Sequence, residues 1–276
     1  PSGNVSRVQT LMQMGQQKTN IAYLSDHTSD TSFNGSTAFQ TLLDSGLTYT
    51  PLTHGELESE YVTLNEDGTV SNLGIQVILL NNVETTTVAA MEKLAEFAEN
   101  GILIINTSAA TSGGGSDPMM MGGEEAEAET EAETEAEEAA VVYPCKVIGT
   151  DTDGSSALAI AEALDRIMAS GNYVECTNQE AIVEAVLNHC TPRISYSISS
   201  LQMTEAYDES DGANYFILYN AGDEDITDGE LTITATGSLY CLDPAYGSVT
   251  KLTDGTEYTA NGDGSATVTG LSLQAG

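Results

Sequence analysis

The sequence predicts an α/β layer followed by an all-β module, and two observations support this. In the first 190 residues, short apolar runs alternate with segments whose apolar residues recur at helical spacing. That alternation indicates right-handed crossovers and a parallel sheet. From Arg193 onward, apolar residues alternate with polar ones at a period of two, broken by Gly, Pro and Asp. This pattern is typical of antiparallel hairpins with one buried face.

The first strands and helices follow one another closely. The helix expected over 84–100 carries Val88, Met91 and Leu94 on one side and ends before Gly101. The runs at 75–80 and 102–105 are apolar enough to be buried on both faces, as parallel strands are. The other expected elements of this part are helices at 5–12 and 38–43 and strands at 21–24 and 47–49.

An acidic segment interrupts this pattern at residues 113–140. Nine glutamates lie between Glu124 and Glu138 without one basic residue. Like charges at this density resist helix formation and cannot bury a core. We therefore expect a disordered, solvated insertion.

The α/β pattern returns after the insertion. Strands are expected at 146–149 and 173–176, and helices at 157–169 and 179–190. Pro192 ends the last helix because proline cannot continue one. The predicted domains are therefore residues 1–192, an α/β domain that contains the insertion, and residues 193–276, a β-sandwich module.

The β module begins with an apolar run from Tyr215 to Tyr219. Alternation requires either Phe216 and Leu218 or Tyr215 and Ile217 to face inward. An alternating strand follows at 231–236. The turn at 243–247 then joins two further strands around 239–241 and 249–252.

The charge excludes several classes of partner. The chain has 42 acidic and 7 basic residues, a net charge of −35. Such a polyanion repels phosphate backbones and anionic membrane surfaces, so we expect no nucleic-acid partner. The apolar runs are too short to span a membrane. High negative charge suits an exported protein in a salty medium, so an extracellular or cell-surface location is expected.

The four cysteines lie far apart, without a Cys-x-x-Cys pair, so zinc binding is not expected. Cys176 and Cys190 occupy apolar-periodic positions, which favours buried free thiols.

The chain resembles the region after the catalytic barrel in large α-L-rhamnosidase-like glycoside hydrolases. The resemblance covers nearly the whole chain except the acidic insertion. Its more specific parts are the segments GIQVILLNNVE and LAEFAENGILII, within residues 74–105, and LDPAYGSVTKL, within residues 242–252. It implies a flavodoxin-like or amidotransferase-like α/β domain followed by β-sandwich modules.

The resemblance also implies a non-catalytic accessory region, because the family's catalytic carboxylates belong to a barrel that this segment lacks. No catalytic residue, cofactor or metal ligand is therefore assigned. The expected partners are the parent's catalytic domain, glycans or a second copy of the chain. The alternatives are a carbohydrate-binding or oligomerisation scaffold without an enzymatic parent, and a flavodoxin-like flavin-binding domain.

Asp26 and Glu84 are the candidate ligand residues. Each follows an apolar run expected to be a parallel strand, and α/β ligands bind at the carboxyl edge of such sheets. Exposed carboxylates that cap or solvate loops give the same pattern, and this structural role is favoured. The position where an amidotransferase-like domain would carry its cysteine holds Thr107-Ser108, which argues against that activity.

Three further patterns have both a functional and a structural interpretation. The hydroxyl-rich loop at 25–37 suits a flavin phosphate, but Asp26 and Asp30 oppose one, and a helix-capping loop is favoured. Residues 151–154 resemble the start of a calcium loop, but the helix begins too early. Strand tyrosines more often pack than bind. The tyrosines considered as a sugar-stacking face are Tyr207, Tyr215, Tyr219, Tyr240 and Tyr246.

Overall fold

The computed structural model describes residues 15–24, 37–81, 83, 85–107, 146–147, 155–208, 210, 212–235, 237–244 and 246–275. The acidic segment at 113–140, the expected helix at 5–12 and the loops at 25–36 and 151–154 lie outside these ranges.

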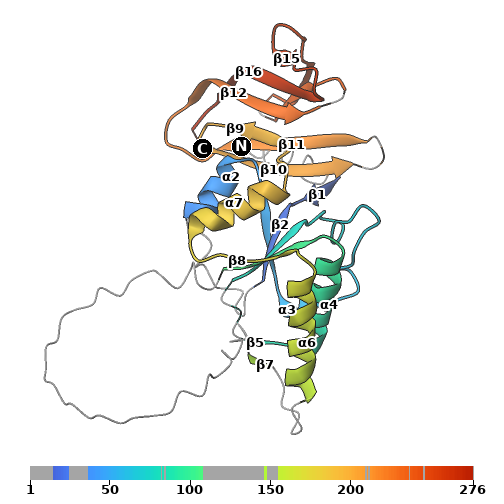
Figure 1. Cartoon of the computed structure of the whole chain (residues 1–276). Coiled ribbons are helices and arrows are strands. Elements are labelled where there is room, and N and C mark those ends of the chain that lie inside the picture. Colours follow the sequence, from blue (N-terminus) through green and yellow to red (C-terminus); the bar gives the residue numbers. More distant parts are fainter. Residues whose placement is uncertain are drawn as a thin grey trace, which may run out of the picture.

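A five-stranded parallel sheet forms the centre of the first part of the chain (Figure 1). In its strand order, β3-β2-β4-β6-β8, the strand that comes second in the sequence, β3, lies at the edge of the sheet beside the strand that comes first, β2. This is the order of flavodoxin-like folds, and it confirms the α/β prediction. The strands are β2 (Ile21–Leu24), β3 (Tyr49–Leu52), β4 (Val77–Leu80), β6 (Leu103–Asn106) and β8 (Tyr173–Glu175).

Helices cover both faces of this sheet. Ala22 and Leu24 of β2 belong to the buried cluster that includes α4 (Val88–Glu99) and α6 (Ser155–Ala169). Ile21 and Tyr23 belong to the cluster that includes α2 (Thr37–Asp44) and α7 (Gln179–His189). Because successive side chains of a strand point to opposite faces, apolar residues at every position bury both sides.

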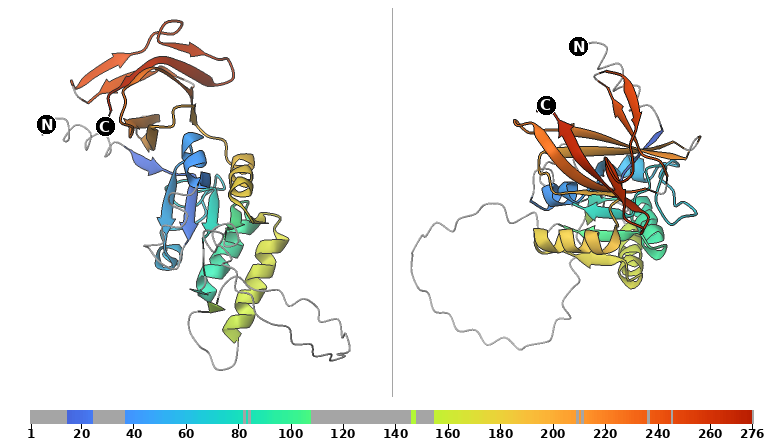
Figure 2. Two further views of the ribbon diagram at one scale, coloured as in Figure 1. Left: turned by 90° about the vertical axis from the view of Figure 1, so that its left-hand side faces the viewer. Right: turned by 90° about the horizontal axis from the view of Figure 1, so that it is seen from above.

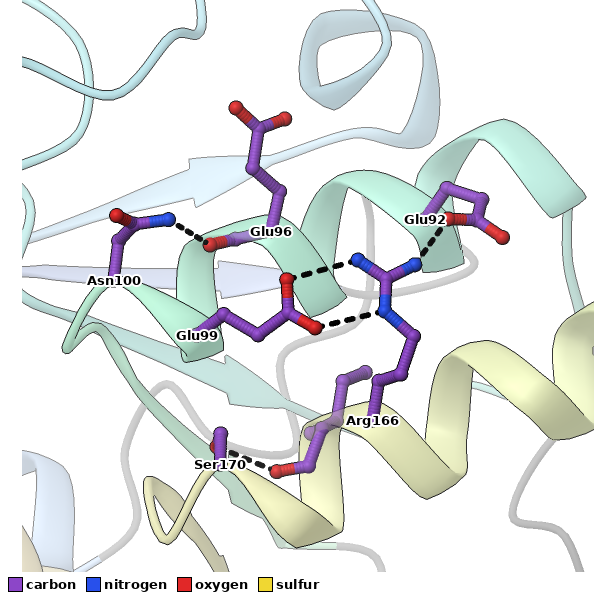
Figure 3. Close-up of polar contacts among 7 residues, drawn as sticks. Glu92, Glu96, Glu99, Asn100, Arg166 and Ser170 are labelled. Atoms are coloured by element: carbon purple, nitrogen blue, oxygen red, sulfur yellow. Dashed lines mark hydrogen bonds and ion pairs between the residues drawn. The ribbon is translucent and has the colours of Figure 1, made fainter.

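Helices α4 and α6 lie side by side, and Arg166 forms ion pairs between them (Figure 3). The Arg166 guanidinium on α6 makes two hydrogen bonds to the Glu99 carboxylate, at 2.8 and 2.9 Å. It also donates to Glu92 at 2.6 Å. Both carboxylates stand on α4, so this contact ties the two helices together at their exposed side.

Several expected elements are displaced by a few residues, and two of them show the effect of local contacts. The strand expected at 47–49 begins at Tyr49, and Leu47 packs in the core just before it. Pro51 is tolerated in β3 because this is an edge strand. The helix expected from residue 84 begins at Val88, where the Thr87 hydroxyl accepts a hydrogen bond from the Ala90 amide at 3.1 Å. Such N-caps fix the first helical residue.

Short elements complete the α/β part. The helix α3 (His54–Leu57) has a capping box between Thr53 and Glu56. The strand expected at 146–149 is described as β7 (Lys146–Val147), which pairs with β5 (Thr85–Thr86) instead of joining the five-stranded sheet.

Antiparallel sheets follow the α/β layer and lie at one end of it (Figures 1 and 2). One has the order β1-β10-β11, the second β15-β16-β12-β9, and a separate hairpin consists of β13 and β14. This agrees with the expected all-β part; their assembly as a sandwich stays a prediction. The strands are β1 (Gln16–Lys18), β9 (Ile194–Tyr196), β10 (Leu201–Asp208), β11 (Ala213–Asn220), β12 (Ile226–Thr234), β13 (Tyr240–Asp243), β14 (Ser248–Lys251), β15 (Tyr258–Ala260) and β16 (Ser265–Leu273).

The two parts of the chain make close contact. Strand β1 precedes the parallel sheet in sequence but pairs with β10. The Tyr196 hydroxyl donates to the Leu43 carbonyl at 2.9 Å. At Gly46, where φ is +80°, a Cβ atom would lie 1.8 Å from the Ile194 carbonyl oxygen. Only glycine permits that approach. These contacts do not test where one domain ends and the next begins, so the boundary at residue 192 stays a prediction.

Three smaller expectations concern the cysteines, membrane-spanning helices and strand β11. Cys176 and Cys190 are free and buried, as expected, and burial raises the pKa of the Cys190 thiol to about 12. Of the residues that the structure describes, none belongs to a helix with the length and apolarity needed to cross a bilayer. The side chains from Tyr215 to Leu218 are all half-buried, so which alternate set of β11 faces inward stays a prediction.

Candidate functional site

The carboxyl edge of the parallel sheet is the first candidate site. Strands β2 and β4 are neighbours, with Leu24 opposite Leu80. The strand order reverses between them, and α/β proteins bind ligands at such a switch point. The adjacency of these two strands is what the Asp26 and Glu84 hypothesis requires.

Asp26 and Glu84 themselves lie outside the described residues. Asp26 follows Leu24 by two residues and Glu84 follows Leu80 by four. Whether their carboxylates approach each other therefore stays a prediction.

Two fully buried polar side chains tie the ends of β4 and β6 together at this edge. The Thr107 hydroxyl lies 3.2 Å from the Leu80 carbonyl oxygen and 3.2 Å from Asn81 Oδ1. The Thr107 amide also donates to the Leu80 carbonyl at 3.1 Å. Thr107 thus has a structural role.

Unused hydrogen-bonding capacity lies on the segments that follow β3 and β4. Thr86 is fully buried, and its Oγ1 has no hydrogen-bond partner in the described part of the chain. The Nε2 atom of His54 is also buried without a partner there. A buried polar atom costs stability unless water or a ligand meets it.

Polar residues also occupy the far end of the same edge. The Tyr173 hydroxyl donates to Glu175 Oε1 at 3.0 Å, and Asn106 Nδ2 lies 3.5 Å from that hydroxyl. Glu175 is exposed, so this group forms a solvated rim instead of an enclosed acid.

A second polar cluster lies between Arg193 and strand β10, and sequence analysis missed it. Glu205 is only 4 % exposed, and Arg193 Nη1 donates to its Oε1 at 3.0 Å. Lys18 stands opposite Glu205 in the β1–β10 ladder. Burial raises the pKa of the Glu205 carboxyl, while the nearby Arg193 and Lys18 charges act against that rise. A carboxylate within an alternating strand gives no sequence signal of such burial.

The histidines do not gather into a described site. His54 is on α3, which packs against α4, whereas His189 ends α7 on the opposite face of the sheet. Burial lowers the pKa of the His189 imidazole. Across the described ranges, no three His, Cys, Asp or Glu side chains are grouped as a metal site requires. A calcium loop that starts at Asp151 would need a bidentate Glu at its twelfth position, which is Glu162, and this residue is exposed on α6.

The tyrosines of the sugar-stacking hypothesis divide into two groups. Tyr207 and Tyr215 are half-buried, and the Lys18 ammonium lies 5.8 Å from the Tyr207 ring centre. Tyr219, Tyr240 and Tyr246 are exposed, Tyr246 by 84 %. Packing therefore explains the first group but not the second.

Comparison with known proteins shows the fold alone. No protein-family model matches the chain. No curated protein matches it either.

Two solved structures are similar in fold along nearly the full length of the chain. A rhamnosidase from Novosphingobium sp. PP1Y matches over 99 % of this chain and 23 % of its own, with a TM-score of 0.61 and 15 % identity. The α-L-fucosidase isoenzyme 2 from Paenibacillus thiaminolyticus matches over 99 % of this chain and 50 % of its own, with a TM-score of 0.51 and 10 % identity. The chain thus spans a quarter to a half of the glycoside hydrolases that it resembles in fold.

Proposed function

We propose that this chain is a non-catalytic accessory region of a larger, exported glycoside hydrolase of the α-L-rhamnosidase type. The observation that carries the proposal is the structural match of nearly the whole chain to one portion of two longer glycoside hydrolases. The match includes both the parallel sheet and the antiparallel sheets, because it covers 99 % of the chain. A shared two-part arrangement at 10–15 % identity supports a common structural role within such enzymes.

The distribution of carboxylates supports a non-catalytic role. Glycosidases need two carboxyl groups roughly 5 to 10 Å apart, one of which has a raised pKa. Within the described ranges, Glu205 is the carboxyl whose pKa is raised. The Glu205 carboxylate already accepts a hydrogen bond from Arg193, and Glu205 is itself a residue of the β1–β10 ladder.

Enzyme assays on two lengths of polypeptide test the proposal. The 276-residue segment should release no nitrophenol from aryl α-L-rhamnosides or α-L-fucosides. The polypeptide extended in both directions along its coding sequence should release it. Turnover by the segment that vanishes in Asp26→Asn or Glu84→Gln would instead make this chain an enzyme in its own right.

The second candidate function is a glycan-binding scaffold without an enzymatic parent. The exposure of Tyr219, Tyr240 and Tyr246 favours it. Extension of the coding sequence separates the two candidates, because a scaffold would lack a neighbouring barrel with paired carboxylates. A flavin-binding domain is the third candidate, and a yellow purified protein would favour it.

A further inference from the structure

The β13–β14 hairpin differs from the other antiparallel strands in having little cover. It pairs with neither of the two larger antiparallel sheets. All four residues of β14 are exposed, and so are Tyr240 and Cys241 of β13, whereas Leu242 and Asp243 are half-buried. An isolated two-stranded hairpin is marginally stable in water. The chain thus keeps an extended, uncovered ladder at its surface.

Apolar side chains are concentrated on this hairpin. Leu242 pairs with Val249 and Tyr240 pairs with Lys251, so these four side chains share one face. We call this face the strip. Tyr240 and Val249 are 54 % and 65 % exposed. Tyr246, 84 % exposed, stands in the turn between the strands. Exposed apolar groups gathered in this way mark interaction sites.

The two hairpin tyrosines are not engaged in packing. Tyr196 donates its hydroxyl to Leu43, and Tyr23 and Phe39 flank Tyr49 in the core. Among the described residues, neither the ring nor the hydroxyl of Tyr240 or Tyr246 has a comparable partner. Tyrosine offers a rigid, amphipathic contact surface at low entropic cost, which suits binding more than solvation.

The size of the hairpin disfavours a protein partner. Four-residue strands about 3.3 Å per residue long and about 4.8 Å apart give a face of roughly 130 Å². A stable protein interface buries about 800 Å² on each partner. A second copy would also bring another charge of −35 to the same surface. The strip suits a ligand that is short, extended and uncharged.

The chemistry around the strip suits a polyhydroxylated ligand. Asp243, Ser248 and Thr250 lie on the opposite face of the same hairpin. Burial raises the pKa of the Cys241 thiol, and the charges of Asp243 and Glu257 add to that rise. Tyrosine rings contact the apolar faces of sugar rings, and the hydroxyl of Tyr240 and the ammonium of Lys251, on the same face, can form hydrogen bonds with sugar hydroxyls. The acidic surroundings repel anionic polymers.

We propose that the β13–β14 hairpin is a stacking platform for a neutral oligosaccharide, with Tyr240 and Tyr246 as its two aromatic contacts. Their backbone positions are about 10 Å apart or more along the strand, so a ligand spans more than one sugar ring. The platform rests on the proposed function, since it gives a carbohydrate-active parent a second contact with its substrate polymer.

Native affinity electrophoresis of the whole 276-residue chain tests the platform. The gels contain arabinogalactan, xyloglucan or galactomannan, and polygalacturonate serves as the anionic comparison. At least one neutral polymer should retard the chain, whereas polygalacturonate should not. Tyr240→Ala/Tyr246→Ala should weaken the binding by about tenfold or more, as loss of a contact hot spot does.

Two variants control for unfolding and for general exposure. Tyr240→Phe/Tyr246→Phe retains the rings and should retain most of the retardation. Tyr61→Ala removes another tyrosine, 78 % exposed but in the α/β part, and should change nothing. The platform is wrong if no neutral polymer retards the chain, or if retardation persists in the double alanine variant. Concentration-dependent sedimentation lost in that variant would also overturn it, in favour of self-association.

The two proposals fail in different ways. Hydrolysis of aryl glycosides by the segment would refute the accessory role while leaving the platform intact. Absence of retardation on all neutral polymers would refute the platform while leaving the accessory role intact.

Discussion

The parallel sheet and the antiparallel sheets are stabilised differently. Before Arg193, buried side chains form two clusters, one on each face of the parallel sheet. After Arg193, the described chain buries only six apolar residues: Ile194, Leu201, Ala206, Ile226, Leu231 and Ala266. The antiparallel part therefore depends more on its backbone ladders, its turns and its contact with the α/β layer.

The same substitution in both parts tests this contrast and should give the largest effect. Phe97 on α4 is fully buried, whereas Phe216 on β11 is half-buried. Phe97→Ala should lower the free energy of unfolding by about 3–5 kcal/mol, because the cavity cannot be filled. Phe216→Ala should lower the free energy of unfolding by less, about 1–2 kcal/mol, because Phe216 buries less apolar surface on folding than Phe97 does. Urea denaturation followed by circular dichroism measures both, and equal costs would contradict the contrast.

This contrast explains what could be predicted from the sequence. Val77 to Leu80 are buried at every position, so the apolar run alone identified a central parallel strand. Strand β1 has the sequence QQK, without an apolar residue, and forms because β10 offers it a partner. Its pairing depends on tertiary contact and leaves no periodic signal.

The candidate site was predictable in part. The sequence indicated that the strands before Asp26 and Glu84 are parallel, and the structure makes them neighbours. Buried Thr86 and Glu205 could not be found in this way, because a single polar residue in a strand does not reveal which face is covered. Burial of such residues depends on how whole layers pack.

The junction between the two parts should be the next most sensitive position. Gly46 and Gly101 both have positive φ, +80° and +98°, but a Cβ would meet backbone only at Gly46. Gly101→Ala should cost about 1–2 kcal/mol from left-handed backbone strain alone. Gly46→Ala should cost more and should loosen the contact with Ile194. Thermal melting and limited proteolysis by a glutamate-specific protease measure the difference, and similar melting temperatures for the two variants would argue against a tight junction.

The Arg193–Glu205 pair should contribute an intermediate effect. Arg193→Met leaves the buried Glu205 carboxylate without its partner, which should lower the free energy of unfolding by about 1–3 kcal/mol. The loss stays in this range because the Arg193 side chain is half exposed, so that water can reach the carboxylate in its place. Glu205→Gln should cost less, because an amide needs no counter-charge. A larger loss in Glu205→Gln than in Arg193→Met, measured by urea denaturation, would show that the charge itself is needed.

The same pair predicts a pH dependence with a definite sign. Burial raises the pKa of Glu205 above its ordinary 4.5, so the folded state holds this proton more tightly than the unfolded state. Its contribution to stability is fully present below pH 4.5 and is lost as pH rises through the raised pKa. Relative to Glu205→Gln, the wild-type chain should lose stability over that window. Parallel stability curves for the two proteins from pH 4 to pH 8 would refute this assignment.

The Arg166 contact between α4 and α6 should have the smallest effect, although it has the best geometry of the described ion pairs (Figure 3). The bidentate hydrogen bonding of Arg166 to Glu99 lowers the pKa of the Glu99 carboxyl and raises the pKa of the guanidinium. Arg166 and both glutamates are more than 40 % exposed, however, so water and salt screen the pair. Arg166→Lys keeps the charge but loses the fork and should lower the melting temperature only slightly. The difference should vanish near 1 M salt, where charges are screened over about 3 Å. A large loss that persists in high salt would mean that the arginine stem packs the two helices together, and that the α/β layer depends on this exposed contact as well as on its buried clusters.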